Sequence, residues 1–363
     1  MNFNFLDEGC LIYTFLFFLT FISIIFVTGK KERNAFFWII VILEILVSSL
    51  RGTTVGADTY GYAVNIIPQL KSLSYKEILH AEVWMVEKEP VCYCFLKFIS
   101  DPFKTYTPYF FILETIFWLS IADTIRRYSK DPLLTLLVFI AFRFSFFNMS
   151  AVRQCIALAI TTFSYRYYVN DKKWYFVLFV ALAFLFHRSA IIFILLLFTG
   201  KINLLKHQWL VYVMAVGFAF MSYVFSSVIG FGTLDDSEIV YMHYVAKDKG
   251  GGNYFSVAFM LIMFVLVSLF IVNNKKTNRY VKEYNIMVLS LLFSMAGLFV
   301  SLFFRISMYF SFLVPILFAN TLKDIKPNSV YQQWLAVGLV LMLVIYVCTG
   351  VVDAYTPYKF YWE

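Results

Sequence analysis

Charged residues are scarce in this chain. Of its 363 residues only 14% are charged, whereas 61% are hydrophobic, and the mean hydropathy is +0.76. A soluble domain has about a quarter of its residues charged. No single water-soluble core of this length could bury so much apolar surface. The composition therefore indicates an integral membrane protein.

Several enzyme motifs are also missing. The sequence contains no Walker loop, no Gly-x-Ser-x-Gly, no His-Glu-x-x-His and no paired metal carboxylates, so ATP hydrolysis, serine hydrolysis and zinc chemistry lose support. Its five cysteines lack metal-ligand spacing, and Cys92 and Cys94 form Cys-x-Cys without a second pair. We expect no metal, no cofactor and no essential disulfide.

Aromatic residues and short basic clusters are abundant instead. The chain holds 43 Phe, 25 Tyr and 7 Trp, which suit lipid-facing and interfacial positions. The net charge of +8 lies in clusters between apolar runs, which the positive-inside rule assigns to cytoplasmic loops. Nucleic-acid binding is not needed to explain it. Asp7 and Glu8 precede the first run without any Lys or Arg, so we expect a retained anchor with its N-terminus outside, not a signal peptide.

Apolar runs of about 20 residues, the length that crosses a membrane, recur along the chain. Residues 90–100 are short for a span, and residues 174–200 are interrupted by His187 and Arg188. With the basic clusters inside, we predict a half-helix entering from outside at 90–100 and a hairpin that turns near His187. Such breaks at membrane depth require burial in protein or a wet cavity, so both predict an internal site. The predicted spans lie near residues 10–28, 35–50, 106–125, 132–148, 151–169, 208–229, 255–272, 284–304, 306–322 and 331–350.

Two long loops are predicted on the outer face, at residues 51–89 and 230–254. The first is predicted to hold a short interfacial helix around residues 74–87. The run Gly250–Gly252 in the second favours a mobile lid or a plain flexible connection. No internal repeat is present, which disfavours a transporter built on inverted repeats. We interpret residues 1–363 as a single transmembrane domain.

Six basic residues at the outer ends of predicted spans suggest a function. Charge inside a membrane is costly and requires a reason. Guanidinium groups match phosphate oxygens with two parallel hydrogen bonds and keep their charge when buried. We therefore predict a site for an anionic ligand, although snorkelling to headgroups is the better explanation of a lone Arg. The six are Arg51, Arg143, Arg153, His187, Arg188 and Arg305.

The segment from Arg51 to Tyr62 is a Gly- and Thr-rich turn that leads to Asp58 and Tyr60. Glycines let backbone N–H groups approach a phosphate or sugar closely. Asp58 could orient an Arg or accept a sugar hydroxyl, and the two Tyr could stack on sugar rings. An ordinary capped turn with interfacial Tyr explains the same residues equally well.

Three further residues suggest chemistry. Arg153 opens an apolar helix, where its charge opposes the helix dipole, and a bound anion would compensate. His187 is a candidate general base, with a structural His at a helix break as the alternative. Glu89 could act as a base or as an Arg partner. Glu44 and Glu114 could be internal ion-pair partners. They rank below Glu89, because no partner for either carboxylate is found nearby in the sequence.

In this order the segments resemble the EpsG family of polysaccharide polymerases, relatives of Wzy-type O-antigen polymerases. Ala57 departs from the pattern, because a hydroxyl residue is expected before the Asp. The resemblance covers most of the chain, and the ordered set is more specific than any single motif. The matching segments are Arg51 to Tyr62, Glu89-Pro90, Arg153-Gln154 followed by Ala157, Phe186 to Ala190, and Arg305 to Tyr309.

The resemblance implies an all-α, GT-C-like polytopic membrane protein with roughly 10–13 transmembrane helices, some of them short, re-entrant or broken. It implies a glycosyltransferase in the bacterial inner membrane with its active site outside. Repeat units on undecaprenyl diphosphate would be polymerised into O-antigen, capsule or exopolysaccharide. Chain-length regulator and flippase proteins would be its protein partners.

In the mechanism that follows, Arg51, Arg153 and Arg305 hold the diphosphate and Arg143 supports them. His187 is the general base, with Asp58 and Glu89 as reserves. The alternatives are a ligase that transfers finished glycan from the same carrier, a flippase or transporter of lipid-linked glycan, and a scaffold subunit. The other predicted substrate-binding residues are Tyr60, Tyr62, Gln154, Arg188 and Tyr309.

Overall fold

The computed structural model describes residues 11–80, 89–199, 202–229, 253–273, 279–324 and 358–363. The chain divides into two compact units, one formed by Met1–Ile191 with Trp334–Glu363 and the other by Ile192–Gln333. Within the described ranges the structure is helical and contains no strand, only an isolated bridge between Arg51 and Phe360. The predicted all-α class is confirmed.

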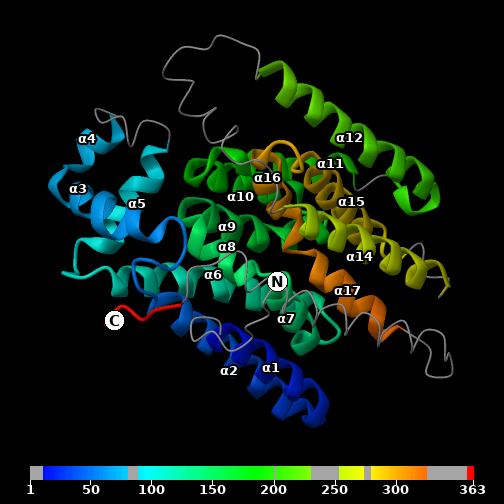
Figure 1. The fold of residues 1–363 in the computed structure, drawn as a ribbon, viewed down its shortest axis with the longest axis horizontal. Helices are drawn as coiled ribbons and strands as arrows, with labels where there is room; N and C mark the ends of the chain where they lie inside the picture. The colour runs from blue at the N-terminus through cyan, green and yellow to red at the C-terminus, as the bar shows by residue number, and fades with distance from the viewer. Residues whose placement is uncertain (1–10, 81–88, 200–201, 230–252, 274–278, 325–357) are drawn as a thin grey trace, which may run out of the picture. The chain divides into compact units, whose positions relative to one another are not determined.

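The first unit holds the segments that carry most of the predicted site (Figure 1). Helix α6 packs against α2 and α9, and α9 packs against α10. Proline begins α5 and α7, where its missing N–H costs no hydrogen bond. The bounds are α1 (Leu11–Phe26), α2 (Lys30–Ser49), η1 (Gly61–Ile66), α3 (Ile67–Ser72), α4 (Tyr75–Leu79), α5 (Pro90–Ser100), α6 (Thr107–Tyr128), α7 (Pro132–Ala141), α8 (Phe144–Ser150), α9 (Val152–Val169) and α10 (Lys173–Phe186).

The second unit is organised around α15, which packs against α12, α14, α16 and α17. Its apolar side chains are buried along most of its length. Within this unit, the hydroxyl groups of Ser290 and Ser311 join α15 to α16 at 2.6 Å. The bounds are η2 (Arg188–Leu195), which crosses the unit boundary, α11 (Leu196–Thr199), η3 (Leu204–His207), α12 (Gln208–Ile229), α14 (Asn253–Asn273), α15 (Val281–Ala296), α16 (Ser301–Ser311) and α17 (Val314–Lys323).

Some described helices are long and apolar enough to cross a membrane. They are α6 and the stretch Leu204–Phe225. Two bent pairs, α7 with α8 and Leu302–Ser311 with Val314–Lys323, meet the same test when each is taken as one span. The described part of the chain therefore holds two such spans, or up to four with the bent pairs. The larger predicted number stays a prediction, and the predicted span at 331–350 and the loop run Gly250–Gly252 lie outside the described residues.

The structure bends or shifts several of the predicted runs. The apolar run 132–148 is not one helix, because α7 and α8 meet at a bend of 56° around Arg143, whose φ is 60°. This left-handed backbone is unfavourable for a residue with a side chain and marks a strained position. The run 284–304 breaks after Ala296, so that Arg305 lies inside α16 and not between two spans.

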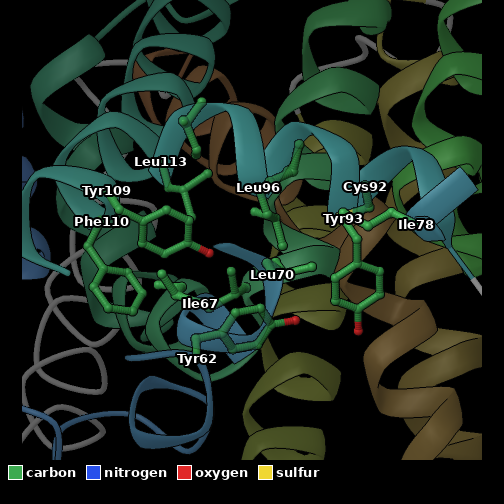
Figure 2. Close-up of a cluster of buried hydrophobic side chains, with 13 residues drawn as sticks. Tyr62, Ile67, Leu70, Ile78, Cys92, Tyr93, Leu96, Tyr109, Phe110 and Leu113 are labelled. Carbon is green, nitrogen blue, oxygen red and sulfur yellow. The ribbon is translucent and has the colours of Figure 1, made fainter. Parts of the chain in front are cut away.

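The predicted breaks at 90–100 and near His187 are present. Residues 90–100 form α5, and α10 ends at Phe186 before a 3-10 helix. By contrast, residues 51–80 are more helical than predicted, because η1, α3 and α4 pack with α5 and α6 around one apolar cluster (Figure 2). The predicted interfacial helix at 74–87 is reduced to α4 in the described range.

Residues 358–361 complete the first unit from a distant part of the chain. The N–H of Gly52 donates to the carbonyl of Lys359 at 2.7 Å, and the N–H of Tyr361 donates to the carbonyl of Leu50 at 2.9 Å. The hydroxyl of Tyr358 donates to the carbonyl of Val47 at 2.8 Å. These bonds hold the backbone on both sides of Arg51.

The turn that follows Arg51 packs directly against the break between α8 and α9. Gly56 has a φ of 85°, and a Cβ built on it would overlap the carbonyl group of Met149. The N–H of Ala57 donates to Oγ of Ser150 at 3.4 Å. Glycine is therefore required at residue 56 both by its backbone conformation and by the close approach.

We predict that Gly56→Ala destabilises the purified chain in detergent by more than about 1 kcal/mol, because alanine is strained at positive φ. A lower melting temperature would show this. Gly61→Ala is the matched control, since no atom of the described chain lies within 4 Å of a Cβ placed there. Equal melting temperatures for the two variants would contradict the packing of this turn.

Candidate active site at Glu89

The carboxylate of Glu89 joins two residues that the sequence placed in separate motifs. Its Oε2 accepts a hydrogen bond from Nη1 of Arg153 at 2.6 Å. Its Oε1 lies 2.7 Å from Nδ1 of His187 and also accepts from the backbone N–H of Arg188 at 3.1 Å. Three of the predicted site residues therefore lie in one cluster, which we call the Glu89 cluster: Glu89, Arg153 and His187.

Local structure explains why these side chains are available to one another. Glu89 precedes α5 and makes no side-chain cap to that helix, whose first residue is Pro90. Arg153 lies in the first turn of α9. Helix α10 ends because His187 takes an extended backbone with φ −155° and ψ 118°, which leaves the next N–H group for Glu89. The cluster is thus built where three helices begin or end.

The Glu89 cluster is buried on one side and accessible on the other. The side chain of Glu89 is 4% exposed, whereas those of Arg153 and His187 are 32% and 24% exposed. Glu89 lies outside the candidate membrane spans. Burial raises the pKa of Glu89, but the hydrogen bond and charge of His187 and the charge of Arg153 outweigh it and lower the pKa below its usual value.

An ionised Glu89 can only accept hydrogen bonds. Nδ1 of His187 is then the donor, and in the neutral imidazole Nε2 carries the free lone pair. Arg153 has five N–H groups, and Glu89 occupies one at Nη1. The arrangement therefore offers a proton acceptor and a partly exposed cation side by side.

Tyr93 was missed by the sequence analysis. The guanidinium carbon of Arg153 lies 5.5 Å from the centre of the Tyr93 ring, within the range of a cation–π contact. Tyr93 lies in the first turn of α5, four residues after Glu89, which directly precedes the helix, so both lie near the same partner. That spacing was the signal that could have identified it.

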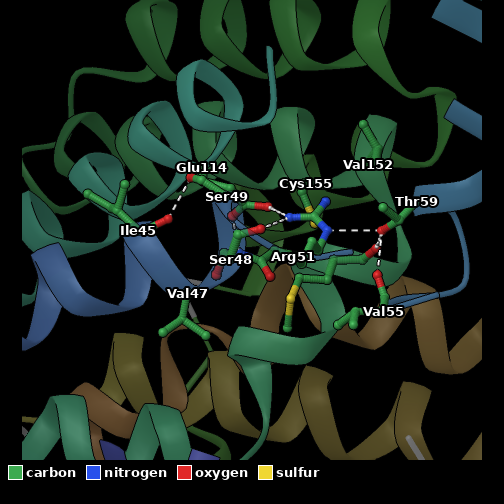
Figure 3. Close-up of polar contacts among 12 residues, drawn as sticks. Ile45, Val47, Ser48, Ser49, Arg51, Val55, Thr59, Glu114, Val152 and Cys155 are labelled. Atoms are coloured by element: carbon green, nitrogen blue, oxygen red, sulfur yellow. Dashed lines mark hydrogen bonds and ion pairs between the residues drawn. The ribbon is translucent and has the colours of Figure 1, made fainter. Parts of the chain in front are cut away.

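Arg51 is buried, unlike Arg153. Figure 3 shows its guanidinium between Glu114 and Thr59. Its side chain is fully buried, and Nη1 donates to Oε1 of Glu114 at 2.6 Å and to the carbonyl of Ser48. Its guanidinium also stacks over the ring of Phe110 at 4.2 Å. Nδ2 of Asn148 donates to the other carboxylate oxygen of Glu114 at 2.5 Å. Glu114, which ranked low in the sequence analysis, is therefore the partner of Arg51.

A small cavity borders Arg51 and Glu114 and is lined mainly by apolar groups, among them Leu113, Phe117 and Ile156. It has room for about one water molecule, too little for a diphosphate. The position of Arg51 thus favours a supporting role over direct ligand contact. Its predicted role in holding the diphosphate stays a prediction.

The remaining predicted site residues are placed as follows. Asp58 accepts a hydrogen bond from the N–H of Val152 at 3.1 Å. Tyr60 is exposed, whereas Tyr62 lies in the core cluster of Figure 2. In the first unit, Gln154 is buried, Arg143 is half-buried and Arg188 is exposed; in the second unit, on α16, Arg305 is exposed and Tyr309 is buried.

No group of three or more His, Cys, Asp or Glu side chains is arranged to hold a metal ion within the ranges that the structure describes. The residues brought together at the Glu89 cluster are a carboxylate, an imidazole, a guanidinium and a phenol ring.

A family model described as the EpsG family matches residues 34–360, nearly the whole chain. No curated protein and no solved structure matches the chain. The match confirms the resemblance inferred from the five motif segments.

We predict that Glu114→Leu destabilises the chain by about 3–5 kcal/mol, because it leaves the guanidinium of Arg51 buried without a carboxylate. The double variant Arg51→Met with Glu114→Leu should recover much of that loss. Thermal unfolding in detergent measures both. As a control, Arg127→Ala removes an exposed ion pair with Asp123 and should cost less than about 1 kcal/mol. If the double variant lost as much stability as the sum of the two single variants, the ion pair between Arg51 and Glu114 would not couple them.

Proposed function

The chain belongs to the EpsG family, and from this membership and the geometry of the Glu89 cluster we propose that it polymerises lipid-linked oligosaccharide repeat units. The family supports a polysaccharide polymerase of glycosyltransferase type, and the apolar helices fit a membrane protein. Our proposal adds undecaprenyl diphosphate as the carrier, an extracytoplasmic active site, a multi-pass GT-C-like fold in the inner membrane, and O-antigen, capsule or exopolysaccharide as product.

One observation supports this proposal most directly: Glu89 holds Arg153 and His187 through its two carboxylate oxygens. Transfer of a glycan from a lipid diphosphate requires a proton acceptor for the incoming hydroxyl and positive charge for the leaving group. The cluster supplies one of each within a single set of hydrogen bonds.

The proposed reaction moves the growing glycan onto a new repeat unit. The bond between the anomeric carbon and the diphosphate oxygen breaks, and the lipid diphosphate leaves with the bonding electrons. The acceptor hydroxyl oxygen forms the new glycosidic bond, and its proton passes to Nε2 of His187. Negative charge that develops on the leaving oxygen is stabilised by the guanidinium of Arg153.

Glu89 is proposed to set the geometry of both reacting groups. Its hydrogen bond to Nδ1 fixes the tautomer and orientation of His187, so that Nε2 faces the acceptor. The same carboxylate holds Nη1 of Arg153 and leaves its other N–H groups for phosphate oxygens. Arg188, exposed beside His187, is a candidate second cation.

The other predicted residues take supporting or additional roles in the proposal. Arg51 organises the interior through Glu114 and supports the site from there. Arg143 shapes the bend between α7 and α8. Arg305 is retained from the sequence as a further diphosphate ligand, and the exposed ring of Tyr60 is available for stacking on a sugar.

Purified full-length chain incubated with lipid-linked repeat units tests the activity. A polymerase produces a ladder of longer glycans on the lipid carrier. A ligase would transfer finished glycan to another acceptor without a ladder, and a flippase would move the substrate across a vesicle membrane without extending it. Either of these results would overturn the proposal.

We predict that Arg153→Ala abolishes polymerisation and leaves single repeat units on the lipid carrier, because the leaving group loses its main positive charge. Surface-glycan length in a deletion strain complemented with the variant measures this. Arg127→Ala, on the exposed side of α6, is the control and should restore native chain lengths. Native lengths in the Arg153 variant would remove this residue from the mechanism.

We predict that His187→Ala lowers kcat by about 10²–10⁴-fold, the range typical of a lost general base. Glu89→Gln should also lower kcat, because its amide cannot accept from both partners as the carboxylate does. Initial rates with purified variants at saturating lipid-linked substrate measure both effects. A His187 variant that changed KM alone would show that the imidazole binds substrate and does not take the proton.

A further inference from the structure

We propose that Asp58 is a positioning residue that fixes the first turn of α9, and with it Arg153. The inference rests on the function proposed for Arg153. Oδ2 of Asp58 accepts a hydrogen bond at 3.1 Å from the backbone N–H of Val152, the first residue of α9 and 94 positions away in sequence. Asp58 thus binds the backbone of Val152, the residue directly before Arg153.

Helix α9 cannot cap its own start. The residue before it is Ala151, whose φ of −146° and ψ of 60° separate α9 from α8 and whose side chain offers no acceptor. The first N–H groups of a helix have no partner within the helix, and alanine is among the poorest N-cap residues. A carboxylate from another segment therefore satisfies a donor that the local sequence leaves open.

The charge of Asp58 has a second effect at the same place. Arg153 lies in the first turn of α9, where its positive charge opposes the helix dipole. Negative charge at a helix N-terminus is stabilising. Asp58 at the N-terminus and Glu89 on the guanidinium together provide the compensation that the sequence analysis assigned to a bound anion.

The turn that carries Asp58 is itself held in place. Oγ1 of Thr59 lies 3.4 Å from the carbonyl oxygen of Met149, at the end of α8, and accepts from Nε of Arg51 at 2.9 Å. Gly56 approaches the same Met149 carbonyl. A chain of contacts therefore runs from the buried guanidinium of Arg51, through this turn, to the start of α9.

This placement gives the Gly-x-Asp segment a role different from ligand binding. Its glycine, the N–H of Ala57 and the Asp58 carboxylate are all directed to residues 149–152. Asp58 acts through Arg153 and is not the base that accepts the substrate proton.

Two variants of Asp58 test the inference. Asp58→Asn keeps a side-chain oxygen at the same distance from the backbone, whereas Asp58→Ala removes it. Asp101→Ala is the control, since Asp101 makes an i,i+4 ion pair with Lys97 away from α9. Each purified full-length variant is examined for hydrogen–deuterium exchange of the amides at residues 152–156, and for KM and kcat with lipid-linked repeat units.

We expect Asp58→Ala to speed exchange at the start of α9 at least fivefold and to raise KM about five- to thirtyfold, the range of a lost helix cap. The Asn variant should stay within threefold of the native protein in both measurements. Unchanged exchange in Asp58→Ala would overturn the inference. Equal loss of kcat in the Ala and Asn variants would also overturn it and identify the carboxylate as a reacting group.

The two proposals fail in different ways. If the native chain extends no glycan at all, the proposed polymerase function fails, while the exchange measurement still decides whether Asp58 fixes α9. If native activity is present and the Ala and Asn variants of Asp58 are equally impaired, the positioning role fails and the polymerase proposal stands.

Discussion

A guanidinium that is fully withdrawn from solvent must be matched by negative charge, and the first unit is organised by this requirement at Arg51. Desolvating a charge costs several kcal/mol unless a partner and further hydrogen bonds compensate. Glu114 on α6 supplies the charge, and Asn148 on α8 supplies a donor to its second oxygen. The end of α2, the middle of α6 and the end of α8 are therefore tied to one ion pair.

The same solution, an arginine held by a carboxylate from a distant segment, appears twice with different consequences. The Arg51 side chain has no exposed surface, whereas that of Arg153 keeps 32%. A closed pair stabilises the fold and leaves no donor facing solvent, while an open pair holds a cation in place and still presents N–H groups. Solvent exposure therefore distinguishes Arg51, which has a structural role, from Arg153, which is suited to bind an anion.

The sequence predicted the helical class, the short helix at residues 90–100 and the break near His187, because the lengths of apolar runs and the charges that interrupt them are local signals. It offered Glu89 as a possible Arg partner but could not choose Arg153, since the two are 64 positions apart. The Arg51–Glu114 pair was hidden for the same reason. The bend at Arg143 was missed because the surrounding run is uniformly apolar, and only the backbone conformation reveals it.

Residues 358–361 pair with the backbone around Arg51, and this has a consequence for how the protein is made. Tyr358 and Val47 are 311 positions apart, and the whole second unit lies between them. During translation, α1 to α10 are synthesised long before residues 358–361 are available to pair with them. The hydrogen bonds on both sides of Arg51 therefore form only after the second unit has been synthesised, because residues 358–361 follow it in sequence.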